Sequence, residues 1–223
     1  MKYRILLCCL LSGIALQAQK LLQVQKTQPV INRQVAKPEP IYKISRQTTD
    51  AYTKMKVKLP FSNAEKEFFV QKMGHFFVLN GDIIVGNDFP KTMSYSHDDV
   101  DYRWPNATLP IIIDPTIYAN NLGDEVHTGI SAFNTLTELC LVPRTTEDDY
   151  IKIIFSNELK GAGLSPVGRQ GGAQSLFLAS SATKGVVIHE LLHAAGFYHE
   201  QCREDRDLFV KINAENLQPG TEN

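Results

Sequence analysis

Hydrophobic residues recur at helical spacing in one stretch of the chain. Between residues 124 and 141 they lie three or four positions apart, which predicts an amphipathic helix whose apolar face carries Val126, Ile130, Phe133 and Cys140. A second helix is expected from near Thr183. It should end at Gly196, because glycine can adopt the left-handed backbone conformation that ends a helix. Two helices are thus expected in the second half of the chain.

Short apolar runs alternate with these helices. Runs rich in branched side chains predict strands at residues 108–114, 150–155 and 175–179. Upstream, the segment from His75 to Val85 predicts a strand, a turn at Asn80–Gly81 and a second strand. The alternation indicates an α/β unit, and the five glycines between residues 161 and 172 indicate a looping, close-packed connection within it.

The first fifty residues lack such periodicity. Two basic residues precede an apolar stretch from Ile5 to Leu16, and small residues up to Ala18 follow, which is the order of a signal peptide cleaved near Ala18. A membrane helix is the alternative, but the apolar stretch is too short to cross a bilayer comfortably. Residues 20–50, rich in Gln, Lys, Thr and Pro, predict a flexible or loosely packed leader. We therefore expect a secreted, extracellular protein with no membrane attachment once the signal is removed.

The composition is that of an ordinary globular protein. Of 223 residues, 43% are apolar and 21% are charged, which allows one mid-sized domain plus accessory segments. The formal net charge of −1 offers no basic surface, so no nucleic acid is expected as a partner. Two of the four cysteines lie in the signal stretch, and the other two, Cys140 and Cys202, could form one disulfide or remain separate thiols.

The strongest chemical signal is the sequence His189-Glu190-Leu-Leu-His193. Residues four apart lie on the same face of a helix, so the two histidines can bind one metal ion. Glu190 lies about a quarter turn around the helix, where its carboxylate can reach a water on the metal without ligating the metal itself. Gly196 can turn the chain so that His199 returns as a third ligand, leaving the open position that a catalytic zinc site needs. Incidental histidines on a surface helix are the alternative, which this spacing disfavours.

The stretch from His189 to Gln201 resembles the long zinc-binding motif of the astacin family, a branch of the metzincins. Further segments extend the likeness over about residues 101–216: Arg103–Pro110, Cys140–Arg144, Tyr150–Ile153, Val167–Gln174 and Arg203–Ile212. The resemblance implies a zincin-like α/β (α+β) fold, in which a twisted mixed sheet accompanies an active-site helix. It further implies that the strand around residues 174–178 pairs with an extended substrate.

The same resemblance implies an activity and its residues. The expected protein is a metalloendopeptidase that hydrolyses peptide bonds in protein or peptide substrates with a zinc-activated water. One Zn²⁺ per chain would be held by His189, His193 and His199, and Glu190 would be the catalytic general base.

Astacin pro-segments carry a Gly-Asp pair whose aspartate takes the zinc position otherwise filled by water. Asn80-Gly81-Asp82 resembles this pair, although an aromatic residue is commoner where Leu79 stands, and on its own the sequence would indicate only a hairpin turn. The resemblance implies a zymogen with Asp82 as its latency ligand, cut near Lys91 by an activating protease. The new amino terminus would then be tied to Glu200. The expected division is a signal peptide (1–18), a pro-segment (19–95) and a catalytic domain (96–223).

The likeness is incomplete in its last part. Family members carry a methionine turn and a metal-reaching tyrosine beyond the third histidine, and neither occurs before Asn223. We therefore expect a C-terminally incomplete catalytic domain that holds only the upper subdomain. The usual partner of Cys140 would lie in the remaining part, a second family disulfide is missing near Gly163 and Ser181, and the family pattern does not explain Cys202. The alternative function is a truncated, non-catalytic zinc-binding homologue.

Overall fold

The computed structural model describes residues 48–62, 64–88, 101–159 and 161–216, all within one compact unit that extends from Lys43 to Asn223. Its strands are β1 (Thr48–Lys58), β2 (Glu65–Met73), β3 (Phe76–Leu79), β4 (Ile83–Asn87), β5 (Thr108–Ile113), β6 (Cys140–Pro143), β7 (Tyr150–Phe155), β8 (Gly163–Pro166) and β9 (Ala173–Leu178). Its α-helices are α2 (Pro115–Ala119), α3 (Gly123–Leu136) and α4 (Lys184–Ala195), and short 3-10 turns follow α4 at Glu200–Cys202, Arg206–Leu208 and Ala214–Asn216.

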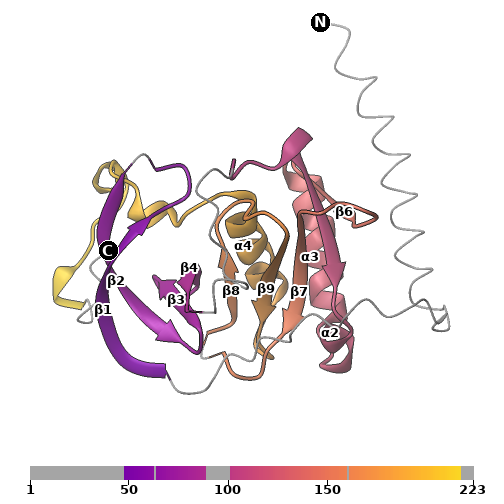
Figure 1. The fold of residues 1–223 in the computed structure, drawn as a ribbon, viewed down its shortest axis with the longest axis horizontal. Coiled ribbons are helices and arrows are strands. Elements are labelled where there is room, and N and C mark those ends of the chain that lie inside the picture. The colour runs from indigo at the N-terminus through magenta and orange to yellow at the C-terminus, as the bar shows by residue number, and fades with distance from the viewer. Residues whose placement is uncertain (1–47, 63, 89–100, 160, 217–223) are drawn as a thin grey trace, which may run out of the picture. The chain divides into compact units, whose positions relative to one another are not determined.

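These strands form a single mixed sheet (Figure 1). Its described strands follow the order β1-β2-β3-β4-β8-β9-β7-β5-β6. The strands from β1 to β4 form an antiparallel meander, whereas β9, β7, β5 and β6 run parallel to one another. β8 is antiparallel to β9 and pairs in parallel with β4, with Ile83 opposite Ser165. The predicted α/β (α+β) fold, with a mixed sheet and a helix that carries the candidate site, is confirmed.

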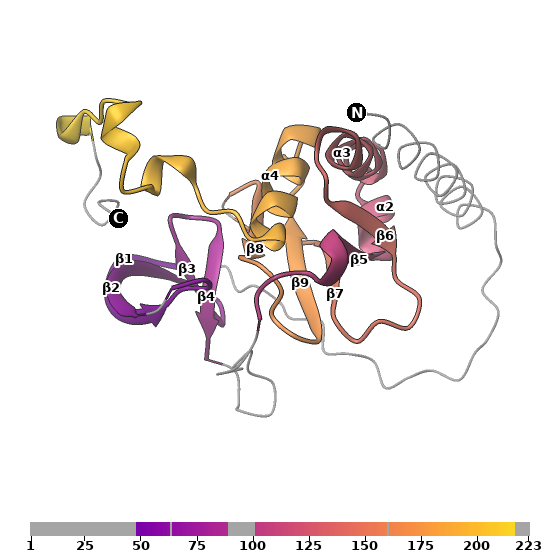
Figure 2. The same ribbon diagram turned by 90° about the horizontal axis from the view of Figure 1, so that it is seen from above.

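The main core lies between this sheet and two helices on one of its faces. α3 and α4 lie side by side on that face (Figure 2). Apolar side chains of both helices and of the central strands are buried together: Val126, Ile130, Phe133, Leu109, Ile151, Ile153, Leu176, Leu178, Val187 and Leu191. The helices approach closely at Gly129, where an added Cβ would lie 2.7 Å from Cγ1 of Val187. The packing therefore fixes α4, which carries the candidate metal ligands.

Most predicted elements are present with small shifts at their ends. β7 coincides with the predicted strand at 150–155, and α4 occupies all but the ends of the predicted helix at 183–196. The predicted hairpin consists of β3 and β4, and both residues of its bend have positive φ, 55° at Asn80 and 93° at Gly81. That conformation explains the Asn-Gly sequence at the turn.

The helix predicted over residues 124–141 is too long. α3 ends at Leu136, because Thr137 adopts an extended backbone and its hydroxyl donates to the Phe133 carbonyl at 2.9 Å. Cys140 lies instead in β6, opposite Thr108 of β5. Its helical spacing from Phe133 is therefore a coincidence of sequence.

The structure departs from two further predictions, one in the glycine-rich connection and one at the end of the leader. The glycine-rich connection at 161–172 contains the buried strand β8, which the sequence analysis did not identify. The predicted loose leader extends to residue 50, yet β1 already begins at Thr48. The signal peptide, most of the leader and the stretch around Lys91 lie outside the described residues.

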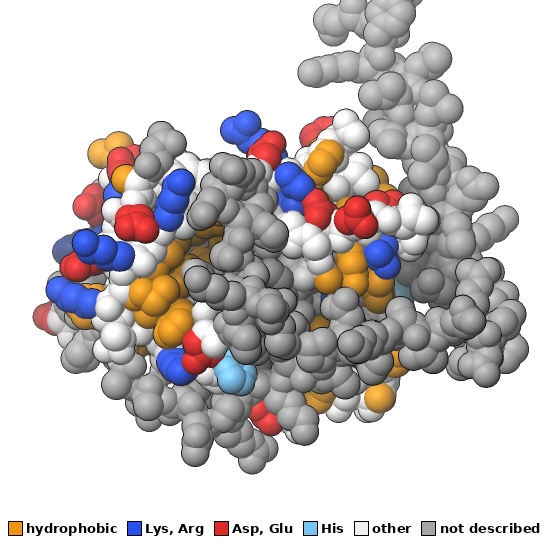
Figure 3. All heavy atoms as spheres, viewed as in Figure 1, with side chains coloured by type: hydrophobic (Ala, Val, Ile, Leu, Met, Phe, Trp, Pro, Cys, Tyr) orange, Lys and Arg blue, Asp and Glu red, His pale blue; other side chains and the backbone are white. Residues whose placement is uncertain are grey.

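Charge and hydropathy on the described surface agree with the composition. Figure 3 shows side chains of both signs interspersed on the face that it displays, without a large area of a single sign. Within the described part of the chain, no helix combines the length and the apolar character needed to span a bilayer.

We expect Gly129→Ala to destabilise the fold by about 1–3 kcal/mol, since the new methyl group would overlap Val187. Without that contact, alanine would stabilise a helix relative to glycine by up to about 1 kcal/mol, so the sign of the change tests the packing. Urea unfolding of the variant measures it. Ser131→Ala, on an exposed position of the same helix, is the control and should change stability by less than about 0.5 kcal/mol. A stabilised Gly129→Ala chain would contradict the close approach of the helices.

Candidate metal centre

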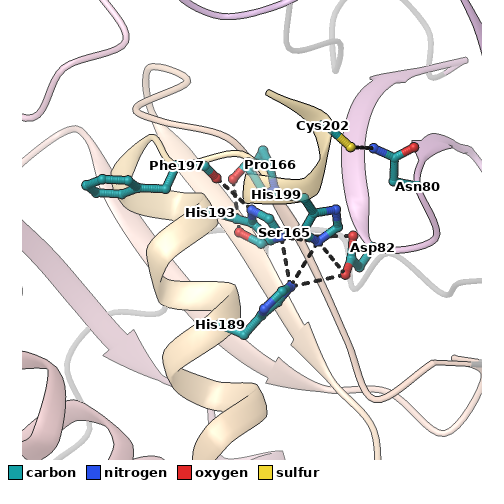
Figure 4. Close-up of polar contacts among 9 residues, drawn as sticks. All are labelled: Asn80, Asp82, Ser165, Pro166, His189, His193, Phe197, His199 and Cys202. Carbon is teal, nitrogen blue, oxygen red and sulfur yellow. Dashed lines mark hydrogen bonds and ion pairs between the residues drawn. The ribbon is translucent and has the colours of Figure 1, made fainter. Parts of the chain in front are cut away.

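Three histidines bring their ring nitrogens to one point (Figure 4). His189 and His193 lie one turn apart on α4, and their Nε2 atoms are 3.0 Å apart. His199, which follows the helix, places its Nε2 atom 3.2 Å from each of them. The spacing predicted from the sequence therefore does bring the three imidazoles together.

A carboxylate from the β3–β4 turn completes this group. Oδ2 of Asp82 lies 3.2 Å from Nε2 of His189 and 3.2 Å from Nε2 of His199 (Figure 4). One ligand atom from each of the four residues lies within 4.8 Å of the other three. Asp82 is held there by its own backbone, because its carbonyl accepts a hydrogen bond of 2.9 Å from the Ser165 amide of β8.

The donor set fits a zinc ion. Bonds of roughly 2.0–2.1 Å in a tetrahedron separate neighbouring ligand atoms by roughly 3.3 Å, close to the spacing of the three nitrogens. Three imidazole nitrogens facing one point cannot satisfy each other by hydrogen bonds, because each such bond needs one proton and one lone pair. Three nitrogens and one carboxylate oxygen are ligands that zinc accepts.

His193 is prepared for its role by a backbone contact. Its Nδ1 atom donates to the carbonyl of Phe197 at 2.7 Å, which leaves Nε2 with its lone pair directed at the centre. The residue is 2% exposed, and burial lowers the pKa of His193 to about 4. The imidazole is therefore neutral at neutral pH, which is the form that binds a metal.

The end of α4 is anchored by groups distant in sequence. The indole nitrogen of Trp104 donates to the Ala194 carbonyl at 2.7 Å, and the amide of Gly168 donates to the His193 carbonyl at 2.9 Å. Carbonyls in the last turn of a helix lack partners within the helix, so these contacts satisfy groups that burial would otherwise penalise. Gly196, with φ of 121°, then turns the chain toward His199.

Nε2 of His199 lies 3.2 Å from Oδ2 of Asp82, within hydrogen-bonding distance. The hydrogen bond to the Asp82 carboxylate is the main cause that raises the pKa of His199 to about 9. A metal ion must replace this proton, so metal binding and proton release are coupled at this residue.

Glu190 is buried beside the group rather than within it. Its carboxylate packs against the backbone of Gly163 in β8, where any side chain would overlap it. The residue is 2% exposed, and Oε2 has no hydrogen-bond partner among the residues that the structure describes. Burial, followed by the charge of Asp82, raises the pKa of Glu190 to about 9.

A cavity of about 470 Å³ opens next to Glu190 and His189. Its walls are the turn around Asp82, residues 161–163 and the first half of α4. A group bound in this cavity would therefore lie within reach of both the metal centre and Glu190.

Glu200 does not join the metal group. Its side chain is exposed, and its Oε2 atom lies 3.4 Å from a guanidinium nitrogen of Arg203. Cys202, which the family pattern did not explain, accepts a hydrogen bond of 3.2 Å from the side-chain amide of Asn80 (Figure 4). Sequence reasoning offered no signal for that contact. No disulfide joins Cys140 to Cys202 in the part of the chain that the structure describes.

The expectation that the strand around residues 174–178 pairs with a substrate is wrong. That strand is β9, which lies between β7 and β8 in the sheet. β7 pairs with β9 along its whole length, and β8 pairs with Phe177 and Leu178. β9 is therefore an interior strand and not an edge strand, with β7 along its whole length and β8 at its last two residues.

Comparison with known proteins gives a family for this arrangement. The model of the peptidase family described as Astacin matches residues 96–223, which is more than half of the chain. The chain belongs to the astacin family. Astacin metalloproteases use zinc, so zinc is the cofactor of this chain, and the His-His-His-Asp group has the geometry to hold it.

Two relatives illustrate the match of this astacin-family chain. It is 36% identical over 122 residues to zinc metalloproteinase nas-14 of Caenorhabditis elegans, covering 54% of this chain and 24% of that protein. It is 37% identical over 124 residues to high choriolytic enzyme 1 of Oryzias latipes, covering 53% of this chain and 44% of that protein. The solved structure of that hatching enzyme, a zinc protease, matches with a TM-score of 0.45 and 36% identity over 52% of this chain and 58% of the other. The chain spans less than half the length of these curated relatives.

We expect the purified chain to hold about one zinc ion. His193→Ala should lower the zinc affinity by at least about 100-fold, because even mutation of a residue that only hydrogen-bonds to a metal ligand lowers metal affinity by about 10- to 100-fold. Metal analysis after dialysis against a weak chelator measures the loss. His127→Ala is the matched control, since His127 lies on α3 beside the Tyr118 hydroxyl, away from the metal group. Equal zinc contents in the two variants would contradict the assignment of His193.

Proposed function

We propose that this chain is the latent form of a zinc-dependent endopeptidase of the astacin family, acting on protein or peptide substrates. The observation that carries the proposal is the convergence of three imidazole nitrogens beside a buried glutamate. A zinc ion held by His189, His193 and His199 would lower the pKa of a water to about 7 and polarise a peptide carbonyl. The proteinase names of the relatives support the same reaction class.

Glu190 is the proposed general base and acid. It would accept a proton from the attacking water and later deliver one to the leaving amine. Its position beside the metal ligands and the cavity supports this role. Its burial favours the protonated form, which is the form needed for the second of these transfers.

The β3–β4 hairpin is the proposed inhibitor. It lies upstream of residues 96–223, which the family model matches and which we call the family-matched region. The carboxylate of Asp82 would fill the fourth ligand position, where the nucleophilic water is needed. β4 also pairs with β8 at Ile83 and Ile84. We propose that β8, rather than β9, binds an extended substrate by strand pairing once β4 has left. Latency would therefore have a chemical and a steric component.

Processing follows from this assignment. Residues 1–18 would direct secretion, residues 19–95 would form the pro-segment, and residues 96–223 would belong to the catalytic domain. An activating protease would cut near Lys91, between β4 and the family-matched region. The new amino terminus would then bind the exposed carboxylate of Glu200.

We expect Glu190→Gln to leave zinc bound and to lower hydrolysis of denatured casein by about 10²- to 10⁴-fold in material freed of its pro-segment. Glu204→Gln, which changes a carboxylate that is 98% exposed, is the control and should retain activity. Turnover that survives in Glu190→Gln would refute the role of the glutamate.

The same assay separates the rival function. A parent chain that binds zinc but hydrolyses nothing would support a non-catalytic zinc-binding homologue, and hydrolysis unaffected by a chelator would count against both functions.

Asp82→Ala should change the metal environment of the uncut chain while leaving the metal bound, because three histidines remain. In Co²⁺-substituted protein, the visible spectrum should change in this variant. Asp88→Ala, at the end of the same hairpin and paired with Lys72 and His75, should keep the parent spectrum. Identical spectra for the parent and Asp82→Ala would show that the carboxylate does not ligate the metal.

A further inference from the structure

The turn between β1 and β2 lies against the end of the zinc-site helix. The amide of Ser62 donates to the Leu59 carbonyl at 3.0 Å and closes this turn. The hydroxyl of Tyr198, the residue before the third histidine, donates to the Pro60 carbonyl at 3.2 Å. A segment far upstream in the sequence thus contacts the loop that positions His199.

Phe61, at the tip of the turn, touches three separate parts of the family-matched region. Its ring packs edge to face with Tyr102, with ring centres 5.8 Å apart and planes at 64°. A Cβ added at Gly196 would lie 3.2 Å from its Cζ atom, and one added at Gly168 would lie 3.4 Å from it. The absence of side chains at both glycines makes room for the ring.

The backbone conformation of Phe61 belongs to the turn of residues 59–62 that carries it. Its φ is 62°, in the left-handed region that residues with side chains rarely adopt. A positive φ at the third residue of a four-residue turn, with proline at the second, is that of a type II turn and sets the direction of the Phe61 side chain. The contacts with Tyr102 and the two glycines are the ones that this side chain makes across the boundary to the family-matched region.

An apolar cluster continues the contact as far as the hairpin. Its buried members are Leu79, Ile83 and Val167, and the partly buried side chains packed against them are Leu59, Phe68, Val85 and Tyr198. Val167 and Tyr198 come from the family-matched region, and the other five come from the segment upstream. The cluster therefore joins the proposed pro-segment to the proposed catalytic domain without using Asp82.

The strand contact between the two parts is short by comparison. β4 and β8 pair at only two positions, Ile83 with Ser165 and Ile84 with Pro166. A pairing of this length gives few hydrogen bonds, so side-chain packing must supply much of the attachment.

We infer that Phe61 and this cluster form a second attachment of the pro-segment, which we call the apolar dock, and that it holds the pro-segment in place independently of Asp82. The dock comprises Phe61, Tyr102 and the seven side chains of the cluster. Cutting the connection near Lys91 would then leave the pro-segment bound over β8, so release is a separate step of activation. The inference rests on the proposed function for the identity of the pro-segment, but its test measures attachment and not hydrolysis.

The test uses the full chain with a recognition sequence for a specific protease placed within residues 89–100. After cutting, size-exclusion chromatography over time gives the rate at which the two pieces separate. We expect the pieces of the parent and of Asp82→Ala to remain together. In Phe61→Ala they should separate about three- to tenfold faster, because the ring, which is 48% exposed, loses its edge-to-face packing with Tyr102.

Leu136→Ala is the matched control, because it removes an apolar side chain that is 79% exposed on α3, outside the dock. The two pieces of this variant should separate at the parent rate. Tyr198→Phe deletes only the hydroxyl that contacts Pro60 and should separate faster than the parent, which keeps the test valid if Phe61→Ala fails to fold. Zinc content of each uncut variant reports on folding.

Three outcomes would overturn the inference. The first is separation of the parent pieces immediately after cutting, and the second is separation of the Asp82→Ala pieces as fast as those of Phe61→Ala. The third is separation of the Phe61→Ala and Tyr198→Phe pieces at the parent rate. None of them depends on peptidase activity. A chain that retains its cut pro-segment but hydrolyses nothing after removal of that piece would support the dock and refute the proposed function.

Discussion

The structure depends on holding three imidazole nitrogens at one point with their lone pairs directed inward. Without a metal, this arrangement is unfavourable, because the nitrogens cannot all donate and accept among themselves. The backbone therefore brings the three rings together: α4 spaces His189 and His193, the Phe197 carbonyl orients His193, and the bend at Gly196 returns His199. Trp104 and Gly168 then secure the end of the helix on which this geometry rests. Zinc supplies the attraction that this preorganised group lacks on its own.

The hairpin from β3 to β4 acts on the metal centre in two ways. Its turn directs the carboxylate of Asp82 at the three nitrogens, and its second strand continues into a pairing with β8. The Asp82 carbonyl, bonded to the Ser165 amide, joins the two effects at one residue. A shift of the hairpin along β8 would therefore move the carboxylate as well. This coupling explains why a short strand contact needs the wider packing around Leu79 and Ile83 to keep its register.

Local pattern was enough to predict the parts of the site that lie close together in the sequence. The interval of four between His189 and His193 and the glycine at 196 encode their own geometry, because helix periodicity and left-handed conformations are properties of single segments. The hairpin turn at Asn80–Gly81 was predicted for the same reason. Asp82, in contrast, became a candidate ligand only through resemblance to a family, since no local signal connects it to a helix more than a hundred residues away. The periodicity that assigned Cys140 to a helix failed because β6 pairs with a distant strand, β5.

Glycines account for most of what the sequence did not reveal. The stretch from 161 to 172 indicated a loop, yet its residues include β8, which is stabilised by pairing with β4 and β9. There, the missing side chain at Gly163 admits the carboxylate of Glu190, and the missing side chains at Gly168 and Gly196 admit the ring of Phe61. Local propensity treats glycine as a breaker of structure, because it scores the freedom of the backbone and not the space that an absent Cβ leaves for another segment. The upstream segment and the metal centre approach each other closely, and the space left by the absent glycine side chains makes that contact possible. The sequence alone does not show which segment fills this space.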